Sequence, residues 1–94
     1  MDAFDMFLRG LQKCIDDKCC FLLSYEDDHS EWTIPFRPVH QIYDMDGLQI
    51  INENDLRFRI KNPDDFTITL HLDHNCPQFT LKNRKDNITY GFCF

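Results

Sequence analysis

Residue types that bind metal ions gather between His71 and Cys76, in the run His-Leu-Asp-His-Asn-Cys. Imidazole, carboxylate and thiolate groups are all protein ligands of zinc and related metals. In a strand, His71 and Asp73 project to the same side, and a following turn can fold His74 or Cys76 toward them. The spacing matches no standard zinc pattern, and a fourth ligand, His40 or Cys93, has to be assumed. We therefore keep a small metal- or thiol-dependent site on His71, Asp73, His74 and Cys76 as the alternative function.

A second group of side chains consists of carboxylates in predicted turns, with an aromatic residue beside them. The candidate partner-binding residues are Glu26, Asp27, Asp28, Glu31, Trp32, Asp44 and Asp46. Surface carboxylates steer a basic partner toward them. In a series of hairpins, alternate turns emerge at the same end of the sheet, which would give one acidic rim. Turns also favour Asp because its side chain bonds the local backbone, so these residues have a structural explanation as well.

The overall charge favours the binding interpretation over a nucleic-acid-binding one. The net charge is −6, which argues against a nucleic-acid-binding surface made by charge excess. We expect a small acidic binding protein, an inhibitor that masks a basic partner such as a nuclease or another nucleic-acid-binding protein. Immunity proteins and viral or phage anti-defence proteins have this character, some by imitating DNA charge. The likeness is one of character and not of motif, and at −6 the imitation would be partial.

Signatures of enzyme active sites are missing from the chain. Three scattered glycines cannot form a phosphate-binding loop, and there is no nucleophile elbow. Cys14, Cys19 and Cys20 do not form a Cys-x-x-Cys motif, and nothing marks one thiol as an activated nucleophile. We expect no catalytic activity and no cofactor.

The five cysteines indicate the expected compartment. They are Cys14, Cys19, Cys20, Cys76 and Cys93. The first residues are acidic and lack the apolar run of a secretory leader, and no segment is long and apolar enough to cross a bilayer. We therefore expect a cytoplasmic protein without membrane contact, whose thiols are free and in several cases buried.

The elements that must position these residues begin with one helix, from Asp2 to about Asp17. Its apolar residues recur at spacings of three and four, which gives a single stripe that faces a core: Ala3, Phe4, Phe7, Leu8, Leu11, Cys14 and Ile15. Asp2 is placed to cap the helix, and Asp5 lies in the first turn, where negative charge is favoured. Gly10 weakens the helix and allows a strand to approach closely.

Short strands with alternating apolar residues follow the helix. Residues 19–25 are expected to pair with residues 32–36, so that Tyr25 faces Trp32, Leu23 faces Ile34 and Phe21 faces Phe36. Pro35 and Pro38 cannot donate ladder hydrogen bonds, so we expect the second of these to be an edge strand or a short one. Residues 39–43 pair with 48–51 around an Asp-Gly turn. Phe79 and Leu81 lie on a further strand, and Ile88 to Phe94 form a last one, an edge that could pair with a second copy to form a homodimer.

The most regular alternation lies between Leu56 and Asp73, and it predicts a central β-hairpin. The turn Asn62-Pro63-Asp64-Asp65 would place Ile60 opposite Ile68 and Phe58 opposite Leu70. Arg57, Arg59 and Lys61 would then form a basic stripe on the outer face. The chain of 94 residues is expected to be a single α+β domain, residues 1–94, with one N-terminal helix packed on a curled antiparallel β-sheet of about six to seven short strands in hairpin succession.

Overall fold

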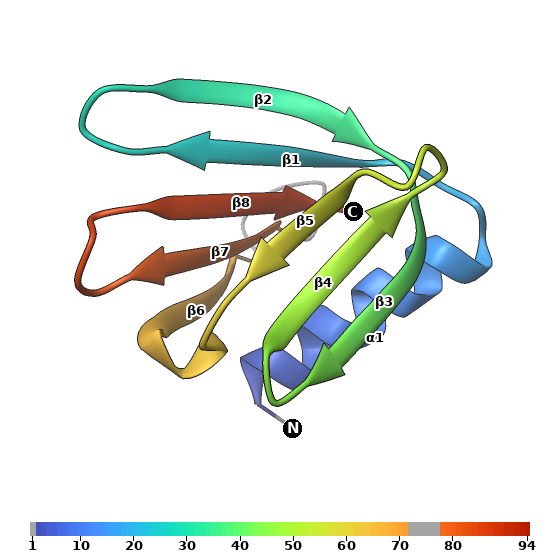
Figure 1. Ribbon diagram of the computed structural model, residues 1–94, viewed down its shortest axis with the longest axis horizontal. Helices are drawn as coiled ribbons and strands as arrows, with labels where there is room; N and C mark the ends of the chain where they lie inside the picture. The colour runs from blue at the N-terminus through green and yellow to red at the C-terminus, as the bar shows by residue number, and fades with distance from the viewer. Residues whose placement is uncertain (1, 72–77) are drawn as a thin grey trace.

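A computed structural model describes residues 2–71 and 78–94 of the chain and shows an α+β fold with a helix packed on antiparallel sheet. The elements are α1 (Ala3–Asp16), β1 (Phe21–Glu26), β2 (Glu31–Phe36), β3 (Pro38–Asp44), β4 (Gly47–Asn52), β5 (Arg57–Ile60), a 3-10 turn (Pro63–Asp65), β6 (Phe66–His71), β7 (Gln78–Asn83) and β8 (Thr89–Cys93). The strands form two sheets (Figure 1). Sheet A has the order β2-β1-β8-β7-β6, and sheet B has the order β3-β4-β5.

Helix α1 forms as the apolar spacing predicts. The Asp2 side chain accepts a hydrogen bond from the Asp5 amide at 2.8 Å, which caps the first turn. Phe7, Leu11 and Cys14 are buried, and they lie on the predicted stripe. Within the described residues, no helix is long and apolar enough to span a membrane.

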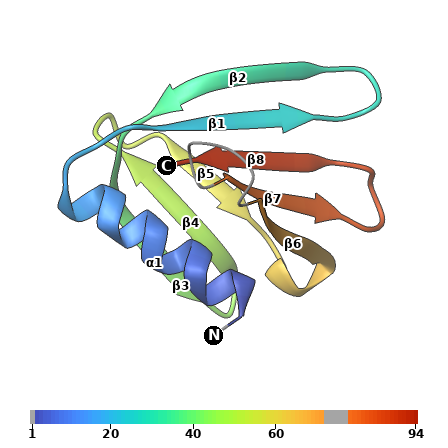
Figure 2. The ribbon, with the colours of Figure 1, turned by 180° about the vertical axis from the view of Figure 1, so that it is seen from behind.

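Helix α1 closes the space between the two sheets. The chain passes from sheet A to sheet B at Arg37, between β2 and β3, and α1 contacts β3 of sheet B and β6 of sheet A (Figure 2). The Phe7 ring packs at 5.7 Å from Phe79 and 4.7 Å from Phe92, both on sheet A. A Cβ atom at Gly10 would lie 3.2 Å from the Phe94 ring, so the helix and the residue after β8 approach closely where no side chain intervenes.

Three predicted strand pairs are confirmed. β1 and β2 pair with Phe21 opposite Phe36, Leu23 opposite Ile34 and Tyr25 opposite Trp32. β3 pairs with β4 around the Asp-Gly turn, and β7 pairs with β8. β2 is an edge strand, as its proline predicts.

The predicted central hairpin is wrong. β5 pairs with β4 in sheet B, where Ile60 lies opposite Leu48, and β6 pairs with β7 in sheet A, where Ile68 lies opposite Leu81. The residues between β5 and β6 form a 3-10 turn after Asn62, whose φ is 50°, and they connect the two sheets. A period of two determines which face of a strand is buried, but it does not determine the neighbouring strand. The described residues therefore form eight strands in two sheets, where about six to seven strands in one sheet were expected.

The segment from Ile88 to Phe94 is also placed differently from its prediction. It contributes β8, which lies in the middle of sheet A between β1 and β7, and so it is not an edge strand. The outer strands are β2 and β6 in sheet A, and β3 and β5 in sheet B. Pairing with a second copy through β8 is excluded because both of its backbone edges are already occupied.

Candidate functional site

Two glutamates face each other at the end of the β1–β2 hairpin. Glu26 ends β1 and Glu31 begins β2, and their Cα atoms are partners in the antiparallel register. Both side chains are exposed, and neither forms an ion pair with a Lys or Arg in the described part of the chain. Like charges directly opposite each other on neighbouring strands are destabilising. The folded hairpin therefore keeps two negative charges opposite each other, with no ion pair in the described residues to offset their repulsion.

The turn between these glutamates is held in shape by its aspartates. The Asp27 carboxylate accepts hydrogen bonds from the amides of His29 at 2.8 Å and Ser30 at 2.6 Å, and also from the Tyr25 hydroxyl. The bond from Tyr25, followed by that from the His29 amide, lowers the pKa of Asp27 below its ordinary value. The same hydroxyl–carboxylate bond raises the pKa of Tyr25 to about 12.

Asp28 ties the β1–β2 turn to the neighbouring turn of sheet A. Its carboxylate accepts a hydrogen bond at 2.5 Å from the side-chain amide of Asn87, between β7 and β8. Both turns lie at the same end of sheet A, on the left of Figure 1. Asp27 and Asp28 therefore preorganise the turn, while Glu26 and Glu31 remain available to solvent.

An aromatic pair is exposed on the other face of the same hairpin. Trp32 stacks on Tyr25 with the ring centroids 5.3 Å apart and an interplanar angle of 14°. Tyr25 lies 5.6 Å from Tyr90 of β8, whose ring meets Phe58 of β5 edge-on. Trp32 is 40% exposed, whereas Phe36 at the far end of β2 is 3% exposed. The inward-facing side chains of β2 are thus buried at the end that carries Phe36 and exposed to solvent at the end that carries Trp32.

Ile34 extends this open apolar face along β2. It lies two residues from Trp32 on the same side of the strand and is 38% exposed. The sequence predicted the cross-strand partners of Ile34 and Tyr25 correctly, which are Leu23 and Trp32, but Ile34 and Tyr25 were not placed in the candidate surface. The signal was available, because the inward face of an edge strand has a neighbour on one side only.

The remaining predicted carboxylates lie elsewhere. Asp44 and Asp46 are in the β3–β4 turn, where the Asp44 carboxylate accepts a hydrogen bond from the Asp46 amide at 2.9 Å. A third acidic turn, between β4 and β5, carries Glu53 and Asp55. Figure 1 shows these three turns at different corners of the molecule, because the chain changes sheet after β2. The structure does not gather them into one acidic rim.

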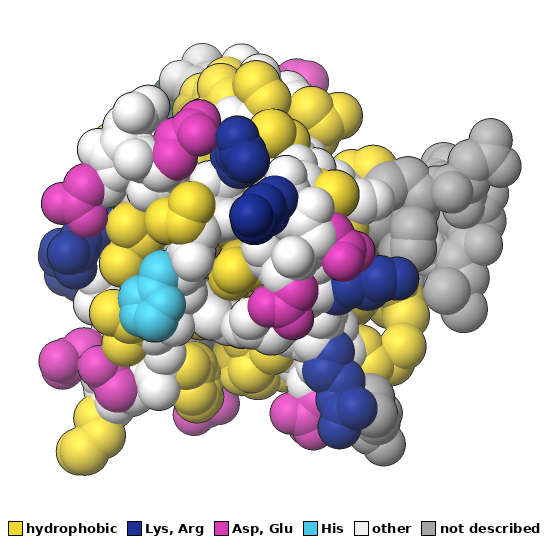
Figure 3. Space-filling model, turned by 90° about the vertical axis from the view of Figure 1, so that its right-hand side faces the viewer, with side chains coloured by type: hydrophobic (Ala, Val, Ile, Leu, Met, Phe, Trp, Pro, Cys, Tyr) yellow, Lys and Arg dark blue, Asp and Glu magenta, His cyan; other side chains and the backbone are white. Residues whose placement is uncertain are grey.

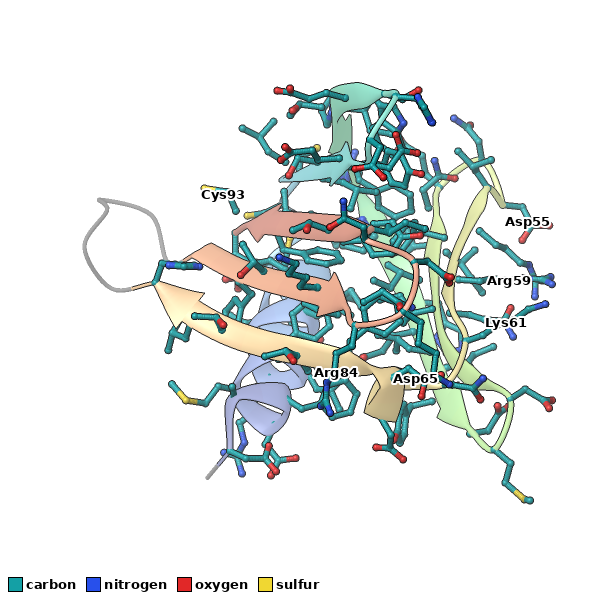
Figure 4. The ribbon with its side chains drawn as sticks, turned by 90° about the vertical axis from the view of Figure 1, so that its left-hand side faces the viewer. Asp55, Arg59, Lys61, Asp65, Arg84 and Cys93 are labelled. Carbon is teal, nitrogen blue, oxygen red and sulfur yellow. The ribbon has the colours of Figure 1, made fainter. Side chains whose placement is uncertain are left out.

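The basic stripe lies on β5, an edge strand of sheet B, and on Lys61, the residue directly after it. Arg57, Arg59 and Lys61 are exposed, as predicted. Figure 4 shows Arg59 and Lys61 projecting from sheet B, away from the strands of sheet A. Arg57 lies 3.6 Å from Asp55 and donates a hydrogen bond to Gln49 at 3.2 Å. The stripe and the acidic β1–β2 turn therefore belong to different sheets.

The alternative site between His71 and Cys76 falls largely outside the described residues. Asp73, His74 and Cys76 lie outside them, and His71 is the last residue of β6. Its Nε2 atom lies 3.0 Å from the Thr80 hydroxyl on β7, a contact that explains its orientation without a metal. Within residues 2–71 and 78–94, no group of three potential metal ligands comes together.

The cysteines differ in part from the expectation of free thiols. Cys14, Cys19 and Cys20 are free, and Cys14 is buried while the other two are exposed. Cys93 is disulfide-bonded, contrary to the expectation. Burial, followed by the proximity of Cys19 and Cys20, raises the pKa of the Cys14 thiol.

Comparisons with known proteins find no matching family model, no matching curated protein and no matching solved structure.

Proposed function

We propose that this protein is a non-enzymatic binding protein that masks a basic partner protein, and that the β1–β2 hairpin is its binding site. The observation that carries the proposal is the aromatic pair next to the opposed Glu26 and Glu31: Trp32 is exposed on the edge strand β2 and stacks on Tyr25 of β1. Tryptophan and tyrosine are enriched among the residues that dominate binding energy at protein interfaces. An uncompensated pair of carboxylates next to them favours a partner that brings positive charge.

The charge of the hairpin supports a basic partner. Residues 21–36 contain four acidic residues and no Lys or Arg. The face on the right of Figure 1 is different, because Lys and Arg side chains there lie among Asp, Glu and hydrophobic ones (Figure 3). An arginine of the partner can stack on the exposed part of Trp32, and a second basic side chain can bind the glutamates on the opposite face of the hairpin. The hairpin thus offers both contacts that a guanidinium group uses.

The class of partner follows from the same chemistry. Proteins that act on nucleic acids present clustered Lys and Arg side chains to the phosphate backbone. An acidic hairpin seated on such a cluster blocks access to the nucleic acid. We therefore propose a nuclease or another nucleic-acid-binding protein as the partner and inhibition as the outcome.

The test compares two variants with the same change in charge. The first carries Glu26→Gln and Glu31→Gln in the hairpin, and the second carries Asp44→Asn and Asp46→Asn in the β3–β4 turn. Each tagged protein is used to capture partners from the source cell at low and at high salt. We expect a basic protein to be captured by the wild type and by the second variant at low salt, and to be lost from the first variant.

Trp32 provides a direct measurement once that partner is purified. It is the single tryptophan of the chain, so its fluorescence reports on this hairpin alone. Binding is expected to shift its emission to shorter wavelength and to protect it from acrylamide quenching. A partner that binds both charge variants equally, or that leaves Trp32 fluorescence unchanged, would show that the hairpin is not the binding site.

A further inference from the structure

The C-terminus of α1 has a geometry that brings two cysteines together. The Cys19 amide donates to the Cys14 carbonyl at 3.0 Å, and the Lys18 amide donates to the Ile15 carbonyl at 3.1 Å. Lys18 has a φ of 56°, in the left-handed region. These two bonds around a left-handed residue define a Schellman motif, in which the side chains at the two ends of the longer bond commonly touch. Here those two residues are Cys14 and Cys19.

The sulfur contacts agree with this placement. The Cys14 thiol donates a hydrogen bond to the Cys19 carbonyl at 3.2 Å, so its sulfur already lies against the backbone of Cys19. A disulfide requires Cα atoms about 4.4–6.8 Å apart. The direct hydrogen bond from the Cys19 amide to the Cys14 carbonyl keeps the backbones of the two residues close together. Rotation of the Cys19 side chain, whose thiol now bonds the Asp17 carbonyl at 3.5 Å, is the main movement needed.

Reagents can reach both thiols. Cys14 and Cys19 line one cavity of about 490 Å³ between α1 and sheet A, whose apolar wall includes Met6, Leu70 and Phe79. Cys19 is also exposed at the surface, whereas Cys14 is 6% exposed. Because the pKa of the buried Cys14 thiol is raised, Cys19 is the thiol that reacts first with an oxidant.

We propose that Cys14 and Cys19 are a redox modification site, which forms a reversible disulfide across the C-terminal turn of α1. The oxidant is a small disulfide such as oxidised glutathione. The Cys19 thiolate attacks one sulfur of the oxidant, which breaks its S–S bond and releases one glutathione thiolate. Cys14 then loses its proton to solvent and attacks the Cys19 sulfur, and the second glutathione leaves. Two protein thiols are oxidised, and one glutathione disulfide is reduced to two glutathione thiols.

The other cysteines are placed less well for this reaction. Cys20 is exposed and lies one residue beyond the motif, where no backbone bond of the described chain joins it to Cys14. Cys93 is already disulfide-bonded. Among the three free thiols of the residues that the structure describes, the geometry therefore selects the Cys14–Cys19 pair.

The test uses Lys13, which precedes the motif, and Lys18, which lies between the two cysteines. The folded protein is treated with oxidised glutathione, its remaining thiols are alkylated, and it is digested with trypsin. Cleavage after Lys13 and Lys18 places Cys14 and Cys19 on separate peptides, so a disulfide joins two fragments that reduction separates. We expect this joined species from the wild type and from Cys20→Ser, with a mass lower by two hydrogen atoms, and we expect it to be absent from Cys19→Ser.

A comparison with the unfolded chain also bears on the proposal. The same oxidation in concentrated urea is expected to give a lower yield of the Cys14–Cys19 link, because the Schellman motif is lost there. A link that persists in Cys19→Ser, a bond between Cys19 and Cys20, or glutathione adducts without a link would each overturn the proposal. An equal yield in urea would also overturn it, since sequence proximity alone would then explain the bond.

Discussion

At the scale of single residues, the aspartates of the β1–β2 hairpin form hydrogen bonds that shape the turn, whereas its glutamates do not. Asp27 accepts two backbone amides and a phenol, and Asp28 accepts the Asn87 amide. Glu26 and Glu31 have no such partners among the described residues. Asp bonds its own turn because its side chain is short, while the longer side chain of Glu extends away from the backbone. The two glutamates are therefore the residues to test for binding.

Replacing Tyr25 with Phe tests the bond that shapes the turn. We expect the pKa of Asp27 to rise toward its ordinary value, because the hydroxyl that stabilises its carboxylate is gone. NMR titration of the side-chain carboxyl carbons in both proteins measures this change. An unchanged Asp27 titration would show that the two backbone amides hold the carboxylate without Tyr25.

The same pair makes stability depend on pH. The pKa of Tyr25 rises from 10.0 to about 12 on folding, so its neutral form contributes stability that is complete below about pH 10 and is lost as the pH rises through about 12. For Asp27 the sign is opposite, because its folded pKa is lowered: its contribution is present above the unfolded pKa and is lost as the pH falls through the folded pKa. Urea unfolding at several alkaline pH values should show a steeper loss for the wild type than for Tyr25→Phe. Burial also raises the pKa of Tyr90, but Tyr90 is present in both proteins, so its contribution to the pH dependence cancels in the comparison.

Reversing one charge of the glutamate pair should stabilise the fold. Glu31→Lys replaces a cross-strand repulsion with an attraction, and we expect a gain of about 0.2–1 kcal/mol in the free energy of unfolding. Urea denaturation at low salt measures this gain, which should shrink at high salt because both side chains are exposed. Glu53→Lys, in a different turn, serves as the control and is not expected to stabilise, since Glu53 is paired with Arg37 at 3.5 Å.

At the scale of elements, the buried side chains determine how the helix and the strands pack together. Sheet A turns Leu23, Phe79, Leu81 and Phe92 inward, and α1 meets them with Phe7 and Leu11. The opposite face of sheet A carries polar side chains such as Ser24 and Thr33, with Gly91 in the middle strand. Alternation along each strand therefore separates a core face from a solvent face.

Phe7→Ala should be severely destabilising. Phe7 is fully buried and touches the rings of Phe79 and Phe92, so its removal leaves a cavity where α1 meets sheet A. We expect a loss of about 3–5 kcal/mol, measured by chemical denaturation. Arg9→Ala, on the exposed side of the same helix, should change the stability by no more than about 0.5 kcal/mol. Similar losses in both variants would mean that α1 is not held by this face.

Gly91 and Ser24 should be energetically coupled. A Cβ atom at Gly91 would collide with the Ser24 hydroxyl oxygen on β1, although the Ser24 Cβ itself is 3.6 Å away. Gly91→Ala is therefore expected to cost about 1–3 kcal/mol through crowding. Adding Ser24→Ala should restore most of that loss, and a double-mutant cycle by denaturation measures the coupling. Additive effects would contradict the close approach of the two strands.

Predictions from sequence succeeded where local chemistry decides the outcome. Asp2 caps α1 because a short acidic side chain precedes an amphipathic run, and the β1–β2 register follows from the large apolar residues at each end of a polar turn. The pairing of β5 failed, since both β4 and β6 supply alternating apolar residues that fit opposite Phe58 and Ile60. The Cys14–Cys19 juxtaposition was also missed, because it depends on the left-handed backbone of Lys18, which the residue type does not indicate.

At the scale of the whole molecule, the change of sheet after β2 decides the distribution of charge. It sends the β3–β4 and β4–β5 turns to other corners and leaves the β1–β2 turn beside the β7–β8 turn. The candidate surface is therefore one hairpin and its neighbour, not a continuous rim. The basic side chains of β5 project from the other sheet, so they do not neutralise it.

Removing residues 88–94 should abolish cooperative folding of sheet A. β8 joins the β1–β2 hairpin to the β6–β7 hairpin, and isolated two-stranded hairpins are marginally stable at best in water. We expect the shortened chain to lack a cooperative urea transition by circular dichroism. A synthetic peptide of residues 88–94, added in excess, should restore part of the transition. A shortened chain that unfolds cooperatively without the peptide would contradict the central role of β8.

The central position of β8 also sets the timing of folding during protein synthesis. β1 is made early, yet its second neighbour is completed only when the ribosome has translated as far as Cys93. Until then the β1–β2 hairpin has an open edge on its β1 side, with the apolar side chains of both strands uncovered. Sheet A therefore cannot form progressively behind the ribosome, and the nascent chain depends on rapid closure, or on a chaperone, to keep that edge from aggregating.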